Sequence, residues 1–399
     1  MDKPAICGGV PVRENKIFYG HQYIDDADIQ AVVDVLRSDY LTCGPKIEEA
    51  EKKLCEVTGA KYAVLCSNGT AALHIACLAA GVCPGDEVIT TPITFAASAN
   101  CALYCGAKPV FADINEETYN IDPENVAALT NDKTKAVVAV DFTGQSVELD
   151  ALLAHCKKNN LVLIEDGAHV IGTSYNGRKN GSIADMTTLS FHPVKTVTCG
   201  EGGAVLTNNE EYYQKLLLYR THGITRDEKQ MVHKSHGSWY YEQVCLGYNY
   251  RITDMQAALL ISQLDKLSLF SARRKEIVKA YDEAFSKLPQ LFVQKEIPES
   301  DTTRHLYILR ICPDKLSIDR KQFFEALAAE NVCCNVHYVP TYYFPYYEEL
   351  GYQKGSCPKA EKLYNEMISL PLYYAMTDED VADVIAAVTK IAQYFTKEE

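Results

Sequence analysis

Short apolar runs alternate with helix-like segments from about residue 60 to residue 242, and this alternation constrains the fold more than any other feature. Apolar runs of strand length, each separated from the next by a segment with helical periodicity, are typical of β-α-β units with parallel strands. The expected strands and helices span 62–66, 70–80, 87–91, 96–104, 109–112, 136–140, 149–158 and 161–164. We therefore predict an α/β fold with a mostly parallel, doubly wound central sheet.

The C-terminal part reads as a second, smaller α/β unit. Its expected elements are a linking helix at 269–286, strands at 306–311 and 332–337, and helices at 319–330, 360–368 and 378–395. At the other end, residues 1–24 look irregular, and Asp25 can cap a helix that runs to about residue 38. We predict two domains: residues 1–250 form the N-terminal and large domain, and residues 251–399 form the linking helices and the small C-terminal domain.

A single lysine, Lys195, lies between an apolar run and a glycine cluster. The run 186–191 is expected to form a buried strand, Pro193 interrupts pairing because it lacks an N–H, and a further strand begins at Ala204. Lys195 therefore lies on a loop between two buried strands, where partial desolvation would favour the neutral, nucleophilic amine that forms Schiff bases. A surface lysine on a hairpin is the alternative interpretation.

Carboxylates end another expected strand. The apolar run 161–164 is followed by Glu165 and Asp166, and open α/β sheets bind ligands at the carboxyl ends of their strands. An aspartate there, with a lysine about 30 residues further on, suits pyridoxal phosphate, whose ring nitrogen takes a carboxylate partner and whose aldehyde takes a lysine. A helix N-cap is the alternative role for Asp166.

The segment Ser67-Asn-Gly-Thr70 joins an expected strand to an expected helix. A strand, a glycine-containing turn and a helix N-terminus make an anion site, because free N–H groups and the helix dipole both favour negative charge. Such turns are common, but in order with Asp166 and Lys195 this one is the third part of a single cofactor site.

Charge and composition exclude several classes of function. The formal net charge of −14 argues against a nucleic-acid partner, which needs a basic surface. No apolar run reaches the roughly 18 residues that span a membrane, and we see no secretory signal, so we expect a cytoplasmic protein without a membrane partner. The 15 cysteines include no C-x-x-C pair, and His233 and His236 lack companion ligands, so we expect neither a disulfide framework nor a metal site.

Together these motifs resemble the DegT/DnrJ/EryC1/StrS family of sugar aminotransferases. The matching stretches are Ser67-Asn-Gly-Thr-Ala-Ala-Leu-His74, Thr91-Pro-Ile-Thr-Phe95, Glu165-Asp-Gly-Ala-His169, Ser190-Phe-His-Pro-Val-Lys-Thr196, Gly200-Glu-Gly-Gly203 and Gly247-Tyr-Asn-Tyr-Arg251. The resemblance implies a fold-type-I pyridoxal-phosphate transferase in which Lys195 and Asp166 are catalytic. It implies that pyridoxal 5′-phosphate is bound by Asn68, Gly69, Thr70, Phe95, Asp166, His169, Ser190 and Lys195. It also implies a homodimer with shared active sites, in which Asn249 reaches the cofactor phosphate of the neighbouring subunit.

A closer resemblance is to the branch that aminates UDP-4-keto-6-deoxy-N-acetylhexosamines at C4 in the pseudaminic acid pathway. It is carried by His192-Pro-Val-Lys-Thr196, Arg220-Thr-His-Gly-Ile-Thr-Arg226 and Trp239-Tyr-Tyr-Glu-Gln243. This resemblance implies a UDP-keto-sugar and L-glutamate as substrates. The substrate contacts that it implies are Tyr19, Leu41, Thr42, Cys43, Gly44, His337, Tyr338, Val339 and Pro340.

Two alternatives stay open at this point. The substrate could be another keto-sugar nucleotide, dTDP-linked or a 3-keto sugar, or the chain could be a non-catalytic regulatory protein, because fold does not fix function. Dehydratases among the relatives carry histidine at the lysine position, so Lys195 argues against that chemistry. A nicotinamide dehydrogenase is disfavoured because Gly200-Glu-Gly-Gly203 lacks the G-x-G-x-x-G spacing.

Overall fold

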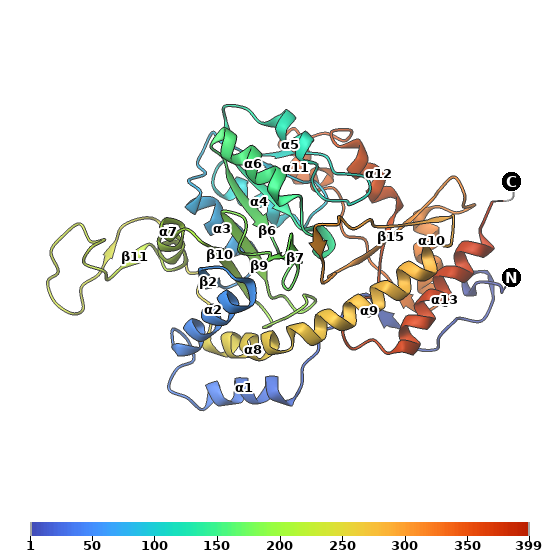
Figure 1. Ribbon diagram of the computed structural model, residues 1–399, viewed down its shortest axis with the longest axis horizontal. Coiled ribbons are helices and arrows are strands. Elements are labelled where there is room, and N and C mark those ends of the chain that lie inside the picture. Colours follow the sequence, from blue (N-terminus) through green and yellow to red (C-terminus); the bar gives the residue numbers. More distant parts are fainter. Residues whose placement is uncertain (1, 398–399) are drawn as a thin grey trace.

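The computed structural model describes residues 2–397 and is organised around a seven-stranded mixed sheet (Figure 1). The strand order is β2 (Tyr62–Cys66), β10 (Gly203–Thr207), β9 (Met186–Ser190), β6 (Val162–Asp166), β5 (Thr134–Val140), β3 (Glu87–Thr90) and β4 (Lys108–Phe111). Neighbouring strands from β9 to β4 are parallel, whereas β10 runs antiparallel to both β9 and β2. The predicted α/β class with a mostly parallel sheet is confirmed.

Helices cover both faces of this sheet. In β5, Ala136 and Val138 pack in the cluster that contains α3 (Gly69–Ala79), whereas Val137 and Ala139 pack in the cluster that contains α6 (Leu149–Asn159). Because successive strand side chains point to opposite faces, a continuously apolar strand needs a cover on both sides. The other helices of this part are α4 (Ala97–Tyr104), α5 (Pro123–Leu129) and α7 (Glu210–Arg220).

Two consecutive helices lead from the large sheet to the C-terminal part (Figure 1). α8 (Asp254–Asp265) begins at a capping box formed by Thr253, and α9 (Leu267–Phe285) follows after Lys266 alone. α8 packs against α1 (Asp26–Leu36) and α2 (Pro45–Thr58), and Asp25 caps α1 as predicted. The linking helix is therefore confirmed close to its predicted bounds.

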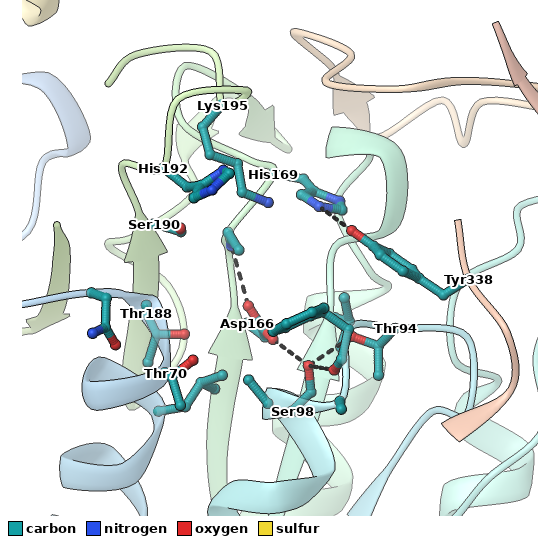
Figure 2. A pocket seen from close by; sticks show the side chains of 18 of the residues that line it. Thr70, Thr94, Ser98, Asp166, His169, Thr188, Ser190, His192, Lys195 and Tyr338 are labelled. Carbon is teal, nitrogen blue, oxygen red and sulfur yellow. Dashed lines mark hydrogen bonds between the residues drawn. The ribbon is translucent and has the colours of Figure 1, made fainter. Parts of the chain in front are cut away.

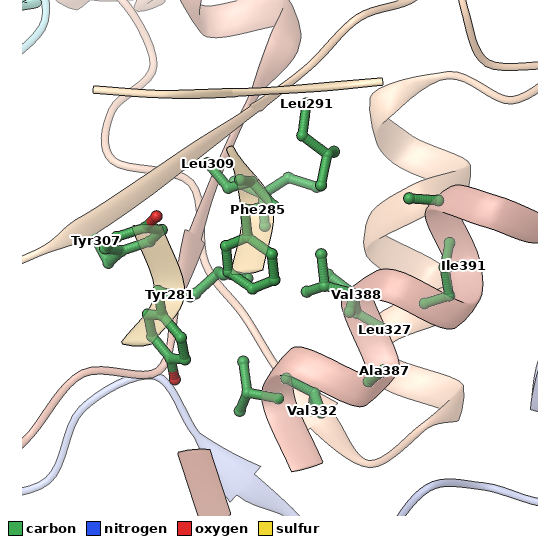
Figure 3. Packing of buried hydrophobic residues seen from close by; sticks show 14 of the residues in the cluster. Tyr281, Phe285, Leu291, Tyr307, Leu309, Leu327, Val332, Ala387, Val388 and Ile391 are labelled. Carbon is green, nitrogen blue, oxygen red and sulfur yellow. The ribbon is translucent and has the colours of Figure 1, made fainter. Parts of the chain in front are cut away.

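The C-terminal part packs an antiparallel sheet against helices. Its strand order is β13 (Leu291–Val293), β15 (Tyr307–Ile311) and β17 (Met367–Leu370). Tyr281 and Phe285 of α9, Leu309 of β15 and Val388 belong to one buried cluster (Figure 3). The remaining helices here are α10 (Arg320–Ala329), α11 (Pro345–Glu349), α12 (Pro358–Glu366) and α13 (Asp378–Tyr394).

Two predicted elements of this part are wrong at one end. The helix predicted at 360–368 ends at Glu366, because the apolar run of β17 pairs with β15 instead of continuing the helix. The strand predicted at 332–337 is reduced to β16 (Val332–Cys333), which pairs in parallel with β1 (Ile17–Phe18). The N-terminal stretch, predicted to be irregular, thus places a short strand beside the C-terminal part. The division of the chain at residue 250 stays a prediction.

Several short elements complete the described chain. They are η1 (Ala5–Cys7), η2 (Phe142–Gly144), β7 (Ser174–Tyr175), β8 (Arg178–Lys179), β11 (Ile224–Thr225), β12 (Glu242–Gln243), β14 (Ser300–Asp301) and η3 (Thr341–Tyr343). β11 and β12 form part of an arm, residues 221–249, that projects from the body of the molecule (Figure 1). Within residues 2–397, no helix is long and apolar enough to cross a membrane.

Candidate active site

A cavity of about 950 Å³ lies at the carboxyl ends of the parallel strands. Val140, Asp166 and Ser190 line it from the ends of β5, β6 and β9, as expected for ligand sites in open α/β sheets. The opposite wall comes from Tyr19 and from residues 335–339 of the C-terminal part. The cavity therefore combines segments that are far apart in the sequence.

Lys195 lies on the loop between β9 and β10. Its N–H donates to the carbonyl of His192 over 2.9 Å, and Thr198 closes the loop by donating its hydroxyl to the carbonyl of Phe191 over 2.9 Å. Figure 2 shows the amine pointing into the cavity across from Asp166. Desolvation lowers the pKa of the Lys195 amine to about 8, although the negative charge of Asp166 opposes this shift. The surface-lysine alternative is therefore wrong, and a reactive amine is available in the cavity.

Asp166 is buried at the end of β6, with 4% of its surface exposed. Its Oδ2 accepts a 2.6 Å hydrogen bond from the Ser98 hydroxyl, and its Oδ1 accepts a 3.2 Å bond from the N–H of Ala168. Burial raises the pKa of the carboxyl, while these two hydrogen bonds and Lys195 lower it. No helix begins after Asp166, so the N-cap alternative is wrong. Ser98 was not predicted, although it lies only three residues after Phe95, the last residue of the motif Thr91–Phe95.

The predicted anion site lies at the N-terminus of α3. Asn68 caps this helix by accepting the N–H of Ala71 over 2.8 Å, and the N–H groups of Gly69 and Thr70 lie in the first turn, where no helical acceptor exists. A Cβ on Gly69 would lie 2.9 Å from the Cβ of Ser190. Glycine therefore lets the helix N-terminus approach the end of β9 closely, which leaves backbone donors facing the cavity.

Phe95 and His169 both line the cavity, as predicted. The Phe95 side chain is 63% exposed, so its ring can cover a flat ligand. His169 is buried, with its Nε2 3.4 Å from the hydroxyl of Tyr338 and its ring centroid 4.5 Å from that of His305. Burial lowers the pKa of His169 well below its ordinary value, so the ring is neutral. His305 was not predicted, because only the tertiary fold brings it to this position.

Most of the predicted contacts on the second wall lie together. Tyr19, His337, Tyr338 and Val339 line the cavity, and the rings of Tyr19 and His337 are 5.1 Å apart. Pro340 does not line it, and its carbonyl accepts the N–H of Tyr343 instead. His192, Phe344 and Asn335 also line the cavity but were not among the predicted contacts.

Two predicted segments lie outside the cavity of their own chain. In the turn Leu41 to Gly44, Thr42 bridges to Thr253 and the N–H of Gly44 donates to Asp254 over 2.8 Å. Asn249 is exposed and bridges to Thr221. A second cavity of about 370 Å³ lies between these segments and includes Cys43, Gly44 and Arg251 in its lining. The roles predicted for the two segments stay predictions.

All 15 cysteines are free thiols. Among residues 2–397, no group of three or more His, Cys, Asp or Glu side chains is arranged to hold a metal ion.

The residues around the cavity fit pyridoxal phosphate. The buried carboxylate of Asp166, which accepts hydrogen bonds from small donors, suits a protonated ring nitrogen. The Lys195 amine, whose pKa is lowered, faces this carboxylate across the cavity. The uncapped N–H groups of α3, with glycine where a side chain would block approach, suit a phosphate. These three features suit different parts of the same molecule, so their presence in one cavity supports a single cofactor site.

Comparison with known proteins agrees with this chemistry. Residues 22–389 match the DegT/DnrJ/EryC1/StrS aminotransferase family. The chain is 40% identical to the spore coat polysaccharide biosynthesis protein SpsC of Bacillus subtilis, over 96% of this chain and 99% of that protein. It is also 40% identical to the UDP-4-amino-4,6-dideoxy-N-acetyl-beta-L-altrosamine transaminase of Campylobacter jejuni (serotype O:23/36), over 91% and 94%.

Among solved structures, the PLP form of Spr1654 from Streptococcus pneumoniae, described as a sugar aminotransferase, matches with a TM-score of 0.88 and 32% identity, over 95% of this chain and 99% of that one. Equal identity to SpsC means that the pseudaminic acid branch is not singled out. The non-catalytic alternative is not kept, because the family match agrees with a cavity that brings Lys195 and Asp166 together. The chain belongs to the DegT/DnrJ/EryC1/StrS aminotransferase family, and it is a sugar aminotransferase that depends on pyridoxal 5′-phosphate.

Proposed function

We propose that this enzyme transfers the amino group of L-glutamate to C4 of a UDP-4-keto-6-deoxy-N-acetylhexosamine, in nucleotide amino-sugar biosynthesis of the pseudaminic acid type. The observation that carries the proposal is the pairing of Lys195 and Asp166 across one cavity, beside a helix N-terminus suited to a phosphate. The choice of sugar is supported by the 40% identity to the Campylobacter jejuni transaminase.

Lys195 carries the proton transfers in this proposal. An amine with a pKa of about 8 is partly unprotonated near neutral pH, so it can bind the cofactor covalently and then act as a base. Once released by the donor, it removes the proton from the Cα of glutamate, and it delivers a proton to C4 of the sugar in the second half of the reaction. When bound, pyridoxal phosphate supplies the electron sink that makes removal of the Cα proton possible.

The other residues of the cofactor end hold and orient the group. Asp166 would accept a hydrogen bond from the protonated ring nitrogen, and the first turn of α3 with Ser190 would hold the phosphate. Phe95 would cover one face of the ring, and the neutral His169 would lie near the phenolic oxygen. Each of these roles leaves Lys195 free to move between the cofactor and the substrate.

The wall formed by Tyr19, His337, Tyr338 and Val339 is the proposed sugar-nucleotide side of the cavity. Ligand pockets of about 300–1,000 Å³ hold drug-sized molecules, so a cavity of about 950 Å³ can take the cofactor and part of a sugar nucleotide. The rest of a UDP-sugar would extend toward the open mouth.

We further propose that the enzyme is a homodimer in which each cavity is completed by the partner. The turn at Leu41 to Gly44 and Asn249 support this idea, because Leu41, Thr42, Cys43 and Asn249 are exposed and none of them lines the main cavity of its own chain. A two-fold interface uses each surface twice, so one exposed segment can serve both cavities.

A second candidate function differs only in the sugar. The Bacillus subtilis protein is as similar as the Campylobacter jejuni transaminase, so another keto-sugar nucleotide, dTDP-linked or with a 3-keto group, is the competing substrate. The amine acceptor, rather than the chemistry at Lys195, distinguishes the two candidates.

The test is an assay of the purified holoenzyme against UDP-4-keto-6-deoxy-N-acetylhexosamines of both stereochemical series, a dTDP-4-keto-6-deoxyhexose and a UDP-3-keto sugar. L-glutamate, L-glutamine and L-aspartate are compared as donors, and products are identified by NMR. We expect the highest kcat/KM with a UDP-4-keto sugar and glutamate. The product should carry its new amine at C4 and at no other carbon, in either the equatorial or the axial configuration. Preference for the dTDP-linked or the 3-keto sugar would replace this proposal with the second candidate.

A further inference from the structure

The carboxylate of Asp166 is fixed by hydroxyl groups from another element. Ser98 of α4 donates to its Oδ2 over 2.6 Å, and the Oγ1 of Thr94 lies 2.7 Å from the Oγ of Ser98 (Figure 2). Both hydroxyl-bearing side chains are almost completely buried, with 1% of Ser98 and 3% of Thr94 exposed. Neither hydroxyl therefore has solvent as an alternative partner.

The available protons give this chain of hydrogen bonds a direction. An ionised carboxylate only accepts, so the single Ser98 proton must point at Asp166. Ser98 then has only lone pairs to offer Thr94, so the Thr94 hydroxyl donates to Ser98. A distance of 2.6 Å is typical of a hydroxyl that donates to a charged oxygen, and consecutive hydrogen bonds polarise one another.

A competing arrangement exists for a neutral Asp166. The carbonyl of Phe95 lies 3.3 Å from the Ser98 Oγ, so the Ser98 proton could turn to it if the carboxyl itself donated to Ser98. The shorter contact to Asp166 favours the arrangement in which the carboxylate is charged. Loss of the Ser98 hydroxyl would remove this preference and leave a buried carboxyl with only the N–H of Ala168 as a close donor.

We propose that Thr94 and Ser98 are positioning residues that hold the negative charge on Asp166 and aim it at the ring nitrogen of the cofactor. Both side chains line the cavity, but the Ser98 hydroxyl is bonded to Asp166 and the Thr94 hydroxyl to Ser98, so in this proposal they act through Asp166. The proposal rests on the aminotransferase chemistry of the site and not on the identity of the sugar.

Other ionisable groups also lie near Asp166 and are part of the test. They are Lys195 across the cavity, Tyr338 of the C-terminal part, and Asp141, which follows β5. Burial disfavours the charged form of Asp166, and the Ser98 hydrogen bond is the leading factor that opposes burial. Removing Ser98 while keeping the other groups therefore isolates the contribution of the hydroxyl chain.

The experiment compares Ser98→Ala, Ser98→Thr and Thr94→Val with the wild-type holoenzyme. Thr90→Val is the matched control, because the buried Thr90 hydroxyl donates to the carbonyl of Val138 over 2.9 Å on the same sheet without contacting Asp166. The readouts are the ¹⁵N chemical shift of the ring nitrogen in protein loaded with ¹⁵N-labelled pyridoxal phosphate, the affinity for the cofactor, and the single-turnover rate with glutamate between pH 5 and pH 9.

We expect Ser98→Ala to slow the glutamate half-reaction about 10- to 100-fold, the range for losing a hydrogen bond to a charged group. The ¹⁵N shift should move toward that of an unprotonated ring nitrogen, and the acid limb of the pH profile should move to higher pH. KM for glutamate should stay within about twofold, since the Ser98 hydroxyl is bonded to Asp166 and acts on the cofactor end of the site. Thr94→Val should show the same changes more weakly, and Ser98→Thr should restore them because it keeps the hydroxyl.

The proposal is overturned if Ser98→Ala keeps the wild-type ¹⁵N shift and pH profile, or if Thr90→Val changes them equally. If Ser98→Ala does not fold, the ¹⁵N shifts of Thr94→Val and Ser98→Thr decide. A failure of the sugar assay with normal ¹⁵N shifts in the wild type would count against the substrate assignment alone, because the shift is measured without any sugar.

Discussion

The cofactor end of the cavity and the surface that carries Asn249 differ in whether their side chains find partners within one chain. At the cofactor end, Asp166 and Ser98 are buried, and each finds its partner within the same chain. Around Asn249 the opposite holds: Leu41 and Leu246 are exposed apolar side chains, and Asn249 itself faces outward. Exposed apolar side chains rimmed by polar ones, such as Asn249 here, are typical of a surface that binds another protein.

This difference separates two kinds of effect. Substitutions at the cofactor end should act within one chain and at any protein concentration. Substitutions on the Asn249 surface should act only through a second chain and should be rescued by an intact partner. The changes below test that separation, beginning with the largest expected effect.

Lys195→Ala should abolish turnover at any protein concentration, with a loss of about 10⁴-fold or more, because the covalent anchor and the proton carrier are removed together. Borohydride reduction followed by peptide mass spectrometry should find the pyridoxyl group on Lys195 in the wild type and on no residue in the variant. Lys133→Ala, an exposed lysine, should stay within about twofold of the wild-type rate. Turnover by Lys195→Ala would assign the chemistry to another amine.

Asp166→Asn should reduce kcat about 10²- to 10³-fold while the protein still binds the cofactor, since a neutral amide cannot stabilise a protonated ring nitrogen. Stopped-flow measurement of the glutamate half-reaction separates this loss from cofactor binding, which is followed by fluorescence titration. A variant with a near-normal half-reaction would exclude an electrostatic role for Asp166.

Asn249→Ala should impair the homodimer less severely, by about tenfold, the order expected for one lost hydrogen bond to a phosphate. Mixed with Lys195→Ala, it should regain activity toward about a quarter of the wild-type level, because half of randomly paired dimers carry one intact site. Native mass spectrometry measures subunit exchange. Exchange without recovered activity would show that the surface around Asn249 does not complete the partner's site.

The buried amine should also give the apo-protein a pH-dependent stability that Lys195→Met lacks. The folded-state pKa of about 8 lies below the ordinary value of 10.5, so the unfolded chain binds more protons between these values. The penalty for burying Lys195 is therefore fully present below pH 8 and fades as the pH rises toward 10.5. Urea titrations at pH 7.5 and pH 10 should show Lys195→Met more stable than the wild type at the lower pH and the advantage reduced at the higher.

Asp141→Asn should have the smallest effect, below about threefold on kcat. Burial, with Glu165 nearby, raises the pKa of Asp141 well above its ordinary value, which favours the neutral form that an amide resembles. The variant can keep the 2.8 Å bond that Oδ1 accepts from the N–H of Val147. Since Asp141 and Asp166 end adjacent strands, a large loss in Asp141→Asn would mean that both carboxylates are charged.

The sequence predicts the parts of the site that lie at ends of local elements. Asp166, Lys195 and the turn at Asn68 each follow a strand, and strand ends meet at one edge of a parallel sheet, so their convergence could be foreseen. Ser98 and His305 could not, because they reach the site from other elements through tertiary packing alone. The error at residues 367–368 has a related cause: a short, largely apolar stretch fits the end of a helix or a strand, and only pairing with β15 decides.

The reversed strand β10 has a consequence for the motion of the reactive amine. A parallel successor to β9 would need a long crossover, whereas β10 returns beside β9, so both ends of the loop at 191–202 are anchored in neighbouring strands about 4.8 Å apart. The backbone of Lys195 is thereby tethered to the most rigid part of the molecule. The amine therefore moves between cofactor and substrate by rotation of its own side chain and not by movement of the loop.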